Sequence, residues 1–185
     1  MHQSIKTVVR LVSATCIFLI TVALILTFYS KAKEIWNAED EYTHKQISQI
    51  QSDATHTYRL LSNNKKPNQA FYIVLQDRGY IAKLNCEHYL ATLCTDRYNE
   101  IGTRVIQDAT FQTFGTHSYL EKIRYMDTQT NMPGSYTWSE QDIKSLYAQD
   151  ISNLKYVLFG VGIFALIALY CSYRILRNFK QFLKK

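Results

Sequence analysis

The sequence of 185 residues predicts an α+β protein in which two transmembrane helices, extended by long juxtamembrane helices, flank one mixed helix and antiparallel-sheet domain outside the cytoplasm. Three observations predict this class. Residues 156–173 form an uncharged run of eighteen residues, residues 11–29 form a second apolar run, and the polar stretch between them contains short β-branched and aromatic segments. A helix of eighteen residues is about 27 Å long, close to the roughly 30 Å thickness of a bilayer's hydrocarbon core.

The basic residues predict the orientation of the two spans. Seven of the 21 lysines and arginines lie in the terminal parts of the chain, where no acidic residue occurs, and the other 14 are matched by all 15 acidic residues in the middle. Because short basic tails usually stay in the cytoplasm, we expect the tails 1–10 and 174–185 to be cytoplasmic and the domain 30–155 to be periplasmic. A domain so close to neutral lacks the basic patch that nucleic acids require.

The first apolar run predicts a retained transmembrane helix over 11–29. A cleaved signal peptide is the alternative, because the run follows a charged start and precedes the small-residue sequence Ser30-Lys31-Ala32. A run of nineteen residues is longer than the core of a signal peptide, which has about 7 to 15 residues, so we expect the segment to be retained.

A long helix is predicted to follow the first span. From Ser30 to Asn63 the chain has no proline or glycine, and its apolar residues recur at steps of three, four and seven. This spacing predicts one helix with a narrow apolar face, which would pack on the domain or on a second copy. The polar sequence 63–68, which contains Pro67, is expected to end it.

Two hairpins are predicted in the domain. Residues 70–76 and 80–85 have the composition of buried strands, and the sequence Asp-Arg-Gly at 77–79 predicts a tight turn between them. Residues 117–128 alternate in a way that suits a strand with one buried face, and residues 135–139 are expected to return after a turn containing proline and glycine.

Three further elements complete the predicted domain. Residues 87–102 predict a helix closed by Gly102, whereas residues 103–114 fit a short helix or a strand equally well. Ser139 is a candidate helix N-cap, with Asp142 three residues later. We expect this last helix to continue without a break into the second span.

Cys86 and Cys94 are the two cysteines of the domain, and in an oxidising compartment they predict a disulfide. On one continuous helix they would lie about 12 Å apart, whereas a disulfide needs Cα atoms within roughly 7 Å. The bond therefore requires Cys86 to lie before the helix, at the end of the preceding strand. Unpaired thiols are one alternative. A redox or metal site with His88 and His117 is another, although this spacing matches no established zinc pattern.

Sequence motifs of enzymes are absent. The chain has no G-x-S-x-G or H-E-x-x-H sequence, no phosphate-binding loop and no dinucleotide fingerprint. We therefore expect no catalytic activity, no cofactor and no resident metal. Neither apolar run contains an acidic or basic residue, so an ion pathway formed by this chain alone is not expected.

Tyrosine is abundant, with fourteen in the chain, and its stiff ring with a polar tip is favoured at interfaces. The alternative is that tyrosine fills half-exposed positions of the sheet. We expect an interaction or ligand surface that contains Tyr72, Val74, Tyr119, Ile123 and Trp138.

The order of span, long helix, sheet, helix and span is similar to that in the extracytoplasmic part of bacterial membrane sensors, where a PAS-like or Cache-like domain lies between two such helices. The resemblance covers the layout only, because no motif of those families stands in this sequence. It also departs from them, since the dozen or so residues after the second span leave no room for an output domain.

These observations predict a non-enzymatic accessory or regulatory protein of the bacterial inner membrane. Its partners would be the lipid bilayer and another membrane or periplasmic protein bound by the periplasmic domain, and a homodimer is compatible with this role. The alternative is a ligand-sensing module, PAS-like or Cache-like in layout, that relays a signal through its two spans to a separate partner.

Overall fold

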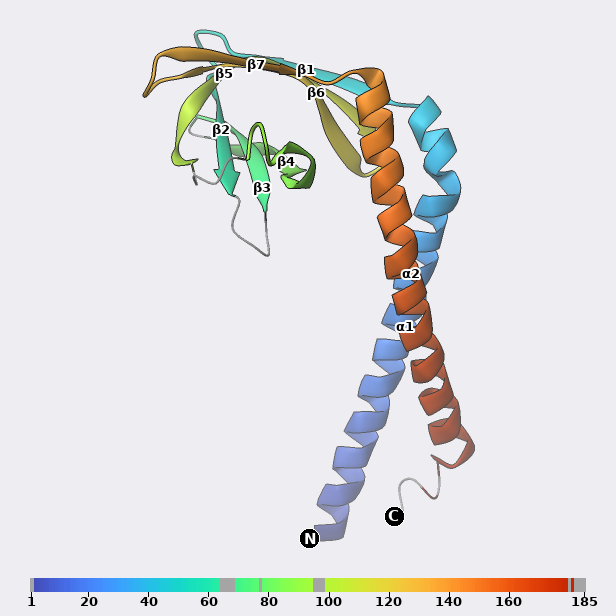
Figure 1. Cartoon of the computed structure of the whole chain (residues 1–185). Helices are drawn as coiled ribbons and strands as arrows, with labels where there is room; N and C mark the ends of the chain where they lie inside the picture. The colour runs from blue at the N-terminus through green and yellow to red at the C-terminus, as the bar shows by residue number, and fades with distance from the viewer. Residues whose placement is uncertain (1, 64–68, 77, 95–98, 180, 182–185) are drawn as a thin grey trace. The chain divides into compact units, whose positions relative to one another are not determined.

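The computed structural model describes residues 2–63, 69–76, 78–94, 99–179 and 181 (Figure 1). The chain divides into two compact units. The first comprises Met1–Glu39 with Asp150–Lys185, and the second comprises Asp40–Gln149.

The first unit is a pair of antiparallel helices. They belong to α1, His2–Thr43, and α2, Glu140–Arg177, and the ends at His2 and Arg177 lie at the same end of the pair (Figure 1). Both helices are long and apolar enough to cross a membrane, with mean hydropathies of 2.5 and 2.1, and only 11% and 6% of their apolar windows are buried. The contacts between them include a hydrogen bond of 2.9 Å between the Thr21 and Ser172 hydroxyls and the packing of Gly162 against the Phe28 ring.

The second unit is built on an antiparallel sheet, which has seven strands in the described residues and the order β4-β3-β2-β5-β6-β7. Strand β5 is the longest, and both β1 and β2 pair with the same edge of it, one after the other. Ser52 bridges the break between these two strands, because its hydroxyl donates to the Ile106 carbonyl and accepts from the Tyr58 N–H. The strands are β1 Gln46–Gln51, β2 Tyr58–Asn63, β3 Ala70–Leu75, β4 Gly79–Asn85, β5 Asn99–Phe114, β6 His117–Asp127 and β7 Met132–Thr137.

One face of the sheet carries the buried core, and we call it the inner face. The segment after β4, with the short 3-10 helix η1, Glu87–Tyr89, covers this face. Tyr89 lies at its centre, since its ring meets the rings of Phe71 and Trp138 at centroid distances of 5.2 and 5.0 Å, edge to face. The Leu120 N–H donates to the Tyr89 hydroxyl at 2.9 Å, so the buried polar tip is satisfied. The fully buried core residues include Leu60, Phe71, Ile73, Leu93, Ile106, Leu120 and Ile123.

Several predicted elements are confirmed. The hairpin of 70–76 and 80–85 is β3 and β4, the strand at 117–128 is β6, and the open segment 103–114 belongs to strand β5. The Ser139 hydroxyl accepts from the Asp142 N–H while the Asp142 carboxylate accepts from the Ser139 N–H, a capping box that begins α2. From there α2 continues without a break into the second apolar run.

The prediction of a single helix from Ser30 to Asn63 is wrong, because α1 ends at Thr43 and the chain continues as β1 and β2. The apolar steps of three in this stretch include Ile47 and Ile50, which lie on one short strand instead of one helical face. Backbone pairing with β5, about 60 residues later in the chain, decides the local structure here.

The predicted helix over 87–102 is also wrong. Within the described residues 87–94 and 99–102, Glu87–Tyr89 form a short 3-10 helix and strand β5 begins at Asn99. The segment curls back so that Leu93 and Cys94 enter the core, which a straight helix would not allow. The predicted break at 64–68 and residue 77 of the first turn lie outside the described residues.

The second hairpin is confirmed with a shifted boundary. Its turn is at Asn131, which has a φ of 53° that asparagine tolerates better than most residues, and β7 begins at Met132, before the predicted return at 135–139.

Candidate functional site

The face of the sheet opposite the core, which we call the outer face, carries a row of side chains that crosses six strands. Cross-strand neighbours share a face, so the row is read from the strand register. It runs from β4 to β7 through Tyr80, Val74, Arg59, Val105, Met126 and Pro133. We call these six residues the outer-face row.

Most of the outer-face row is apolar and accessible. Tyr80 is 70% exposed, Pro133 is exposed, and Val74, Val105 and Met126 are half-buried. Tyr72 and Leu61 lie on the same face in an adjacent row and are also half-buried. Tyrosine, methionine and arginine are residue types that are enriched at protein interfaces.

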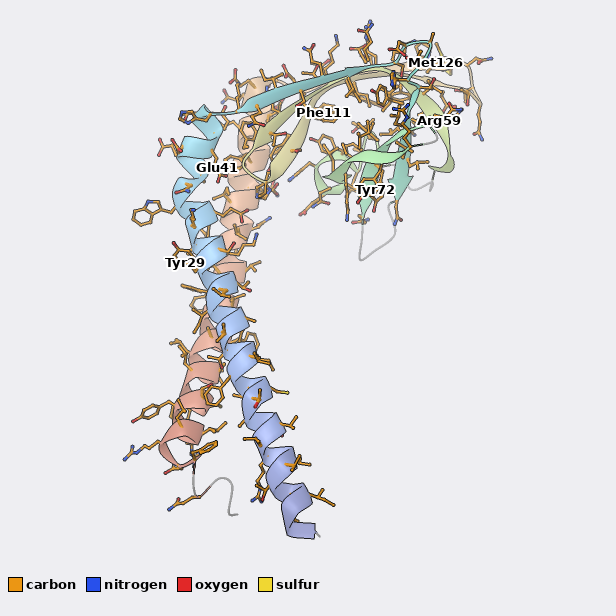
Figure 2. All side chains as sticks on the ribbon, turned by 180° about the vertical axis from the view of Figure 1, so that it is seen from behind. Tyr29, Glu41, Arg59, Tyr72, Phe111 and Met126 are labelled. Carbon is orange, nitrogen blue, oxygen red and sulfur yellow. A yellow bond between two sulfur atoms is a disulfide. The ribbon has the colours of Figure 1, made fainter. Side chains whose placement is uncertain are left out.

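Arg59 stands in the middle of the outer-face row. Its neighbours in the chain, Tyr58 and Leu60, pack into the core, so its own side chain points the other way. Val74 and Val105 lie on either side of it in the adjacent strands. Figure 2 labels Arg59 together with Tyr72 and Met126, which belong to the same face.

Further along the outer face, polar residues replace apolar ones. Arg124 Nε donates to the Asp108 carboxylate, and Lys122 Nζ lies 3.7 Å from the same carboxylate. Asp108, three residues along β5 from the Arg59 neighbour Val105, is thus paired with two cations. Exposed ion pairs of this kind contribute little to stability, so they mark a solvated part of the face.

The five residues that the sequence predicts for an interaction or ligand surface do not form one site. Tyr72 and Val74 lie on the outer face, half-buried. Tyr119 and Ile123 are 2% and 0% exposed, and Trp138 packs against the core, so these three serve the interior. Arg59, Tyr80, Val105 and Met126 were missed. Tyr58–Ser62 read Tyr-Arg-Leu-Leu-Ser, which does not alternate polar and apolar residues, so the sequence carried no clear strand signal here.

Cys86 and Cys94 form a disulfide with a Cα separation of 5.7 Å, and both are buried. Cys86 follows the last residue of β4, as the reach of a disulfide requires. Neither sulfur is then a thiolate able to bind a metal. In the described residues no group of three or more histidine, cysteine, aspartate or glutamate side chains is placed to hold a metal ion. The bond indicates an oxidising compartment.

A second group of aromatic rings packs the end of α1 and the start of α2, which belong to the second unit, against the sheet. Tyr42 of α1 and Tyr147 of α2 meet Phe114, at the end of β5, with centroid distances of 5.2 and 5.0 Å. His117 and Tyr119 of β6 also pack against Tyr147. We call these five residues the aromatic cluster.

An ion pair reinforces the same junction. Lys45 Nζ lies 2.5 Å from Glu140 Oε1. The hydrogen bond from Lys45 lowers the pKa of Glu140, and the hydrogen bond to Glu140 raises the pKa of Lys45. Both side chains therefore keep their charges over the whole neutral range.

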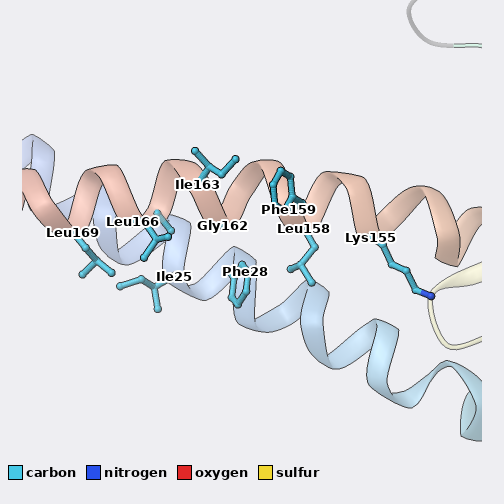
Figure 3. Close-up of a pocket in the computed structure, with 10 residues that line it drawn as sticks. Ile25, Phe28, Lys155, Leu158, Phe159, Gly162, Ile163, Leu166 and Leu169 are labelled. Carbon is cyan, nitrogen blue, oxygen red and sulfur yellow. The ribbon is translucent and has the colours of Figure 1, made fainter.

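An open apolar groove with a volume of about 710 Å³ lies along the two helices of the first unit (Figure 3). Lys155 is the one charged residue of its lining. The other lining residues are Ile25, Phe28, Leu158, Phe159, Gly162, Ile163, Ala165, Leu166 and Leu169.

No protein-family model matches the chain, and no curated protein or solved structure is significantly similar to it.

Proposed function

We propose that this chain is a membrane-anchored accessory protein whose sheet domain binds another protein through the outer face. The outer-face row is the observation that carries the proposal. A sheet face that met only water would carry mainly polar residues. This one presents an apolar or aromatic side chain on five of the six strands of the row, and Arg59 on the sixth.

The two long helices support the anchoring part of the proposal. Their apolar side chains point outward along both apolar runs, including Leu19 at 65% and Leu166 at 69% exposed, and such surfaces need an apolar surrounding. The basic residues at both ends of the chain favour a two-pass arrangement in the bacterial inner membrane with cytoplasmic termini. The sheet domain then lies in the periplasm, an oxidising compartment in which the Cys86–Cys94 disulfide persists.

Photo-crosslinking in intact cells tests the proposal. The photoreactive analogue p-benzoylphenylalanine replaces Tyr80 or Met126 of the outer-face row, and Gln49 of the exposed, polar strand β1 is the control position. We expect an adduct with a different protein from both row positions and none from Gln49. Adducts that contain only a second copy of this chain, or equal labelling from Gln49, would contradict a specific partner at this face.

A ligand-sensing module is the second candidate, and the aromatic cluster favours it. Tyr42 and Tyr147 tie helix residues to the hairpin of β5 and β6, so a shift of that hairpin would be transmitted to α1 and α2. A thermal-shift screen of the full chain in detergent separates the candidates. A small molecule that raises the unfolding temperature in proportion to its concentration would support sensing.

A further inference from the structure

Arg59 has a buried hydrogen-bond donor without an acceptor in the described part of the chain, and this indicates the chemistry of the partner. Its Nε atom is buried, and no group among the described residues accepts a hydrogen bond from it. A guanidinium offers five N–H donors in a planar fork, which fits a carboxylate with two parallel hydrogen bonds. A donor buried without an acceptor costs free energy. Because Nε has almost no exposed surface, a partner's carboxylate removes that cost once the half-buried Arg59 side chain turns toward the partner.

The neighbouring charges on the outer face are already engaged. Asp108 is held by Arg124 and Lys122, and Lys83 Nζ lies over the Tyr72 ring at 5.9 Å from its centroid. For Arg59, which lies within the row, the described residues provide neither a carboxylate nor another acceptor for Nε. Since Val74 and Val105 flank it, a partner that covers the row would also exclude water around the guanidinium.

We infer that the partner presents a carboxylate, from an aspartate or glutamate within an apolar surface, that binds Arg59 at the centre of the outer-face row. The inference rests on the proposed function and names the recognition element of the same surface. Removing one member of a buried charge-assisted pair at the middle of an interface strongly weakens binding, so Arg59 would determine which partners bind.

Charge disfavours the simplest alternative occupant. A second copy placed face to face across a twofold axis through this row would bring two Arg59 side chains together, and like charges brought together in a water-excluded interface are unfavourable. A twofold dimer centred on this row is therefore disfavoured, and the partner that we infer is a different protein with the opposite charge at this point.

The test uses the full chain in cells with the photoreactive analogue at position 126, in combination with Arg59→Lys, Arg59→Gln or Arg59→Glu. Arg124→Gln is the matched control, because it removes one exposed positive charge from the same face. We expect Arg59→Gln to lower the adduct yield by about tenfold and Arg59→Glu to abolish the adduct. Arg59→Lys should retain part of the yield, and Arg124→Gln should leave it within about twofold.

Two measurements keep the result interpretable. The gel mobility of the oxidised Cys86–Cys94 form reports whether each variant folds. Mass spectrometry of the adduct identifies the partner's residue, and its replacement by arginine should restore the adduct with Arg59→Glu. Full crosslinking by folded Arg59→Gln, or no rescue by the swapped pair, would overturn the carboxylate contact while leaving the proposed function intact. Absence of any adduct in the unsubstituted chain would overturn the proposed function itself.

Discussion

Tyr89 shows how one side chain closes the inner face. Its ring fills the centre of the core, and its hydroxyl accepts the hydrogen bond of the Leu120 N–H. Replacement by phenylalanine keeps the ring and leaves a buried N–H without this acceptor. We expect Tyr89→Phe to lower the free energy of unfolding by about 1 to 3 kcal/mol.

Tryptophan fluorescence of the full chain in detergent measures this effect, because Trp138 lies against Tyr89, and Trp36 is replaced by phenylalanine to remove its signal. Tyr80→Phe is the matched control, since Tyr80 is 70% exposed, and it should change stability by less than about 0.5 kcal/mol. Equal stabilities of the two variants would show that the hydroxyl contact is not formed.

Asp53 gives the domain a defined response to acid. The Thr55 hydroxyl and the Thr55 and His56 N–H groups donate to its carboxylate at 2.7 Å each and lower its pKa from 3.8 to about 2. Because the folded-state pKa lies below the unfolded value, the stabilisation is complete above pH 3.8 and is lost as the pH falls toward 2.

We therefore expect Asp53→Asn, which keeps the acceptor oxygen but cannot titrate, to show a smaller loss of unfolding temperature between pH 4 and about pH 2 than the unsubstituted chain. Thr55→Ala should move the loss to higher pH, because it removes the largest cause of the shift. Identical pH profiles for all three proteins would contradict the assigned hydrogen bonds.

The segment between Cys86 and Cys94, which follows β4, covers the core of the sheet and is closed by the disulfide. Reduction of Cys86–Cys94 opens a loop with a sequence separation of eight and should lower stability by about 2 to 3 kcal/mol in the chain-entropy model. Unfolding with and without reductant measures this. Cys16→Ala with Cys171→Ala is the control, because these free thiols should not alter the response to reductant.

The β5–β6 turn depends on glycine at residue 115. Gly115 has a φ of +56°, and a Cβ there would lie 2.1 Å from Glu41 Oε2, whereas Gly79, with a φ of +90°, has nothing within 4 Å of its Cβ position. Both Gly115→Ala and Gly79→Ala introduce backbone strain of about 1 to 2 kcal/mol. Only Gly115→Ala also displaces Glu41.

We expect Gly115→Ala to lower the unfolding temperature more than Gly79→Ala, and Glu41→Ala to recover the difference when the two changes are combined. A loss of stability in the double mutant that equals or exceeds the sum of the two single losses would contradict the contact between Gly115 and Glu41.

Sequence patterns correctly predicted those elements that are determined by residues close together in the chain. The capping box at Ser139 and the hairpin of β3 and β4 depend on residues close in sequence. The strand β1 could not be predicted in the same way, since its pairing with β5 joins Ile47 to Gln112. Arg59 was hidden for the same reason, because a residue assigned to a helix has no sheet face.

At the scale of the whole molecule, the chain contains a helix pair with apolar surfaces and a sheet domain with a disulfide and a largely apolar row on its outer face. The apolar runs could be predicted because membrane thickness sets their length. The outer-face row could not, because it depends on the order and register of six strands. We propose that the sheet domain lies outside the cytoplasm while both chain ends lie within it.

Cysteine accessibility measures this directly. In a chain with Cys16→Ala and Cys171→Ala, single cysteines are introduced as Gln129→Cys in the exposed turn before β7 and as Asn178→Cys after α2. We expect a membrane-impermeant maleimide to label the first cysteine in cells with a permeable outer membrane, and to label the second only after the inner membrane is disrupted. Labelling of Asn178→Cys in cells with an intact inner membrane, with Gln129→Cys protected, would contradict the proposed orientation.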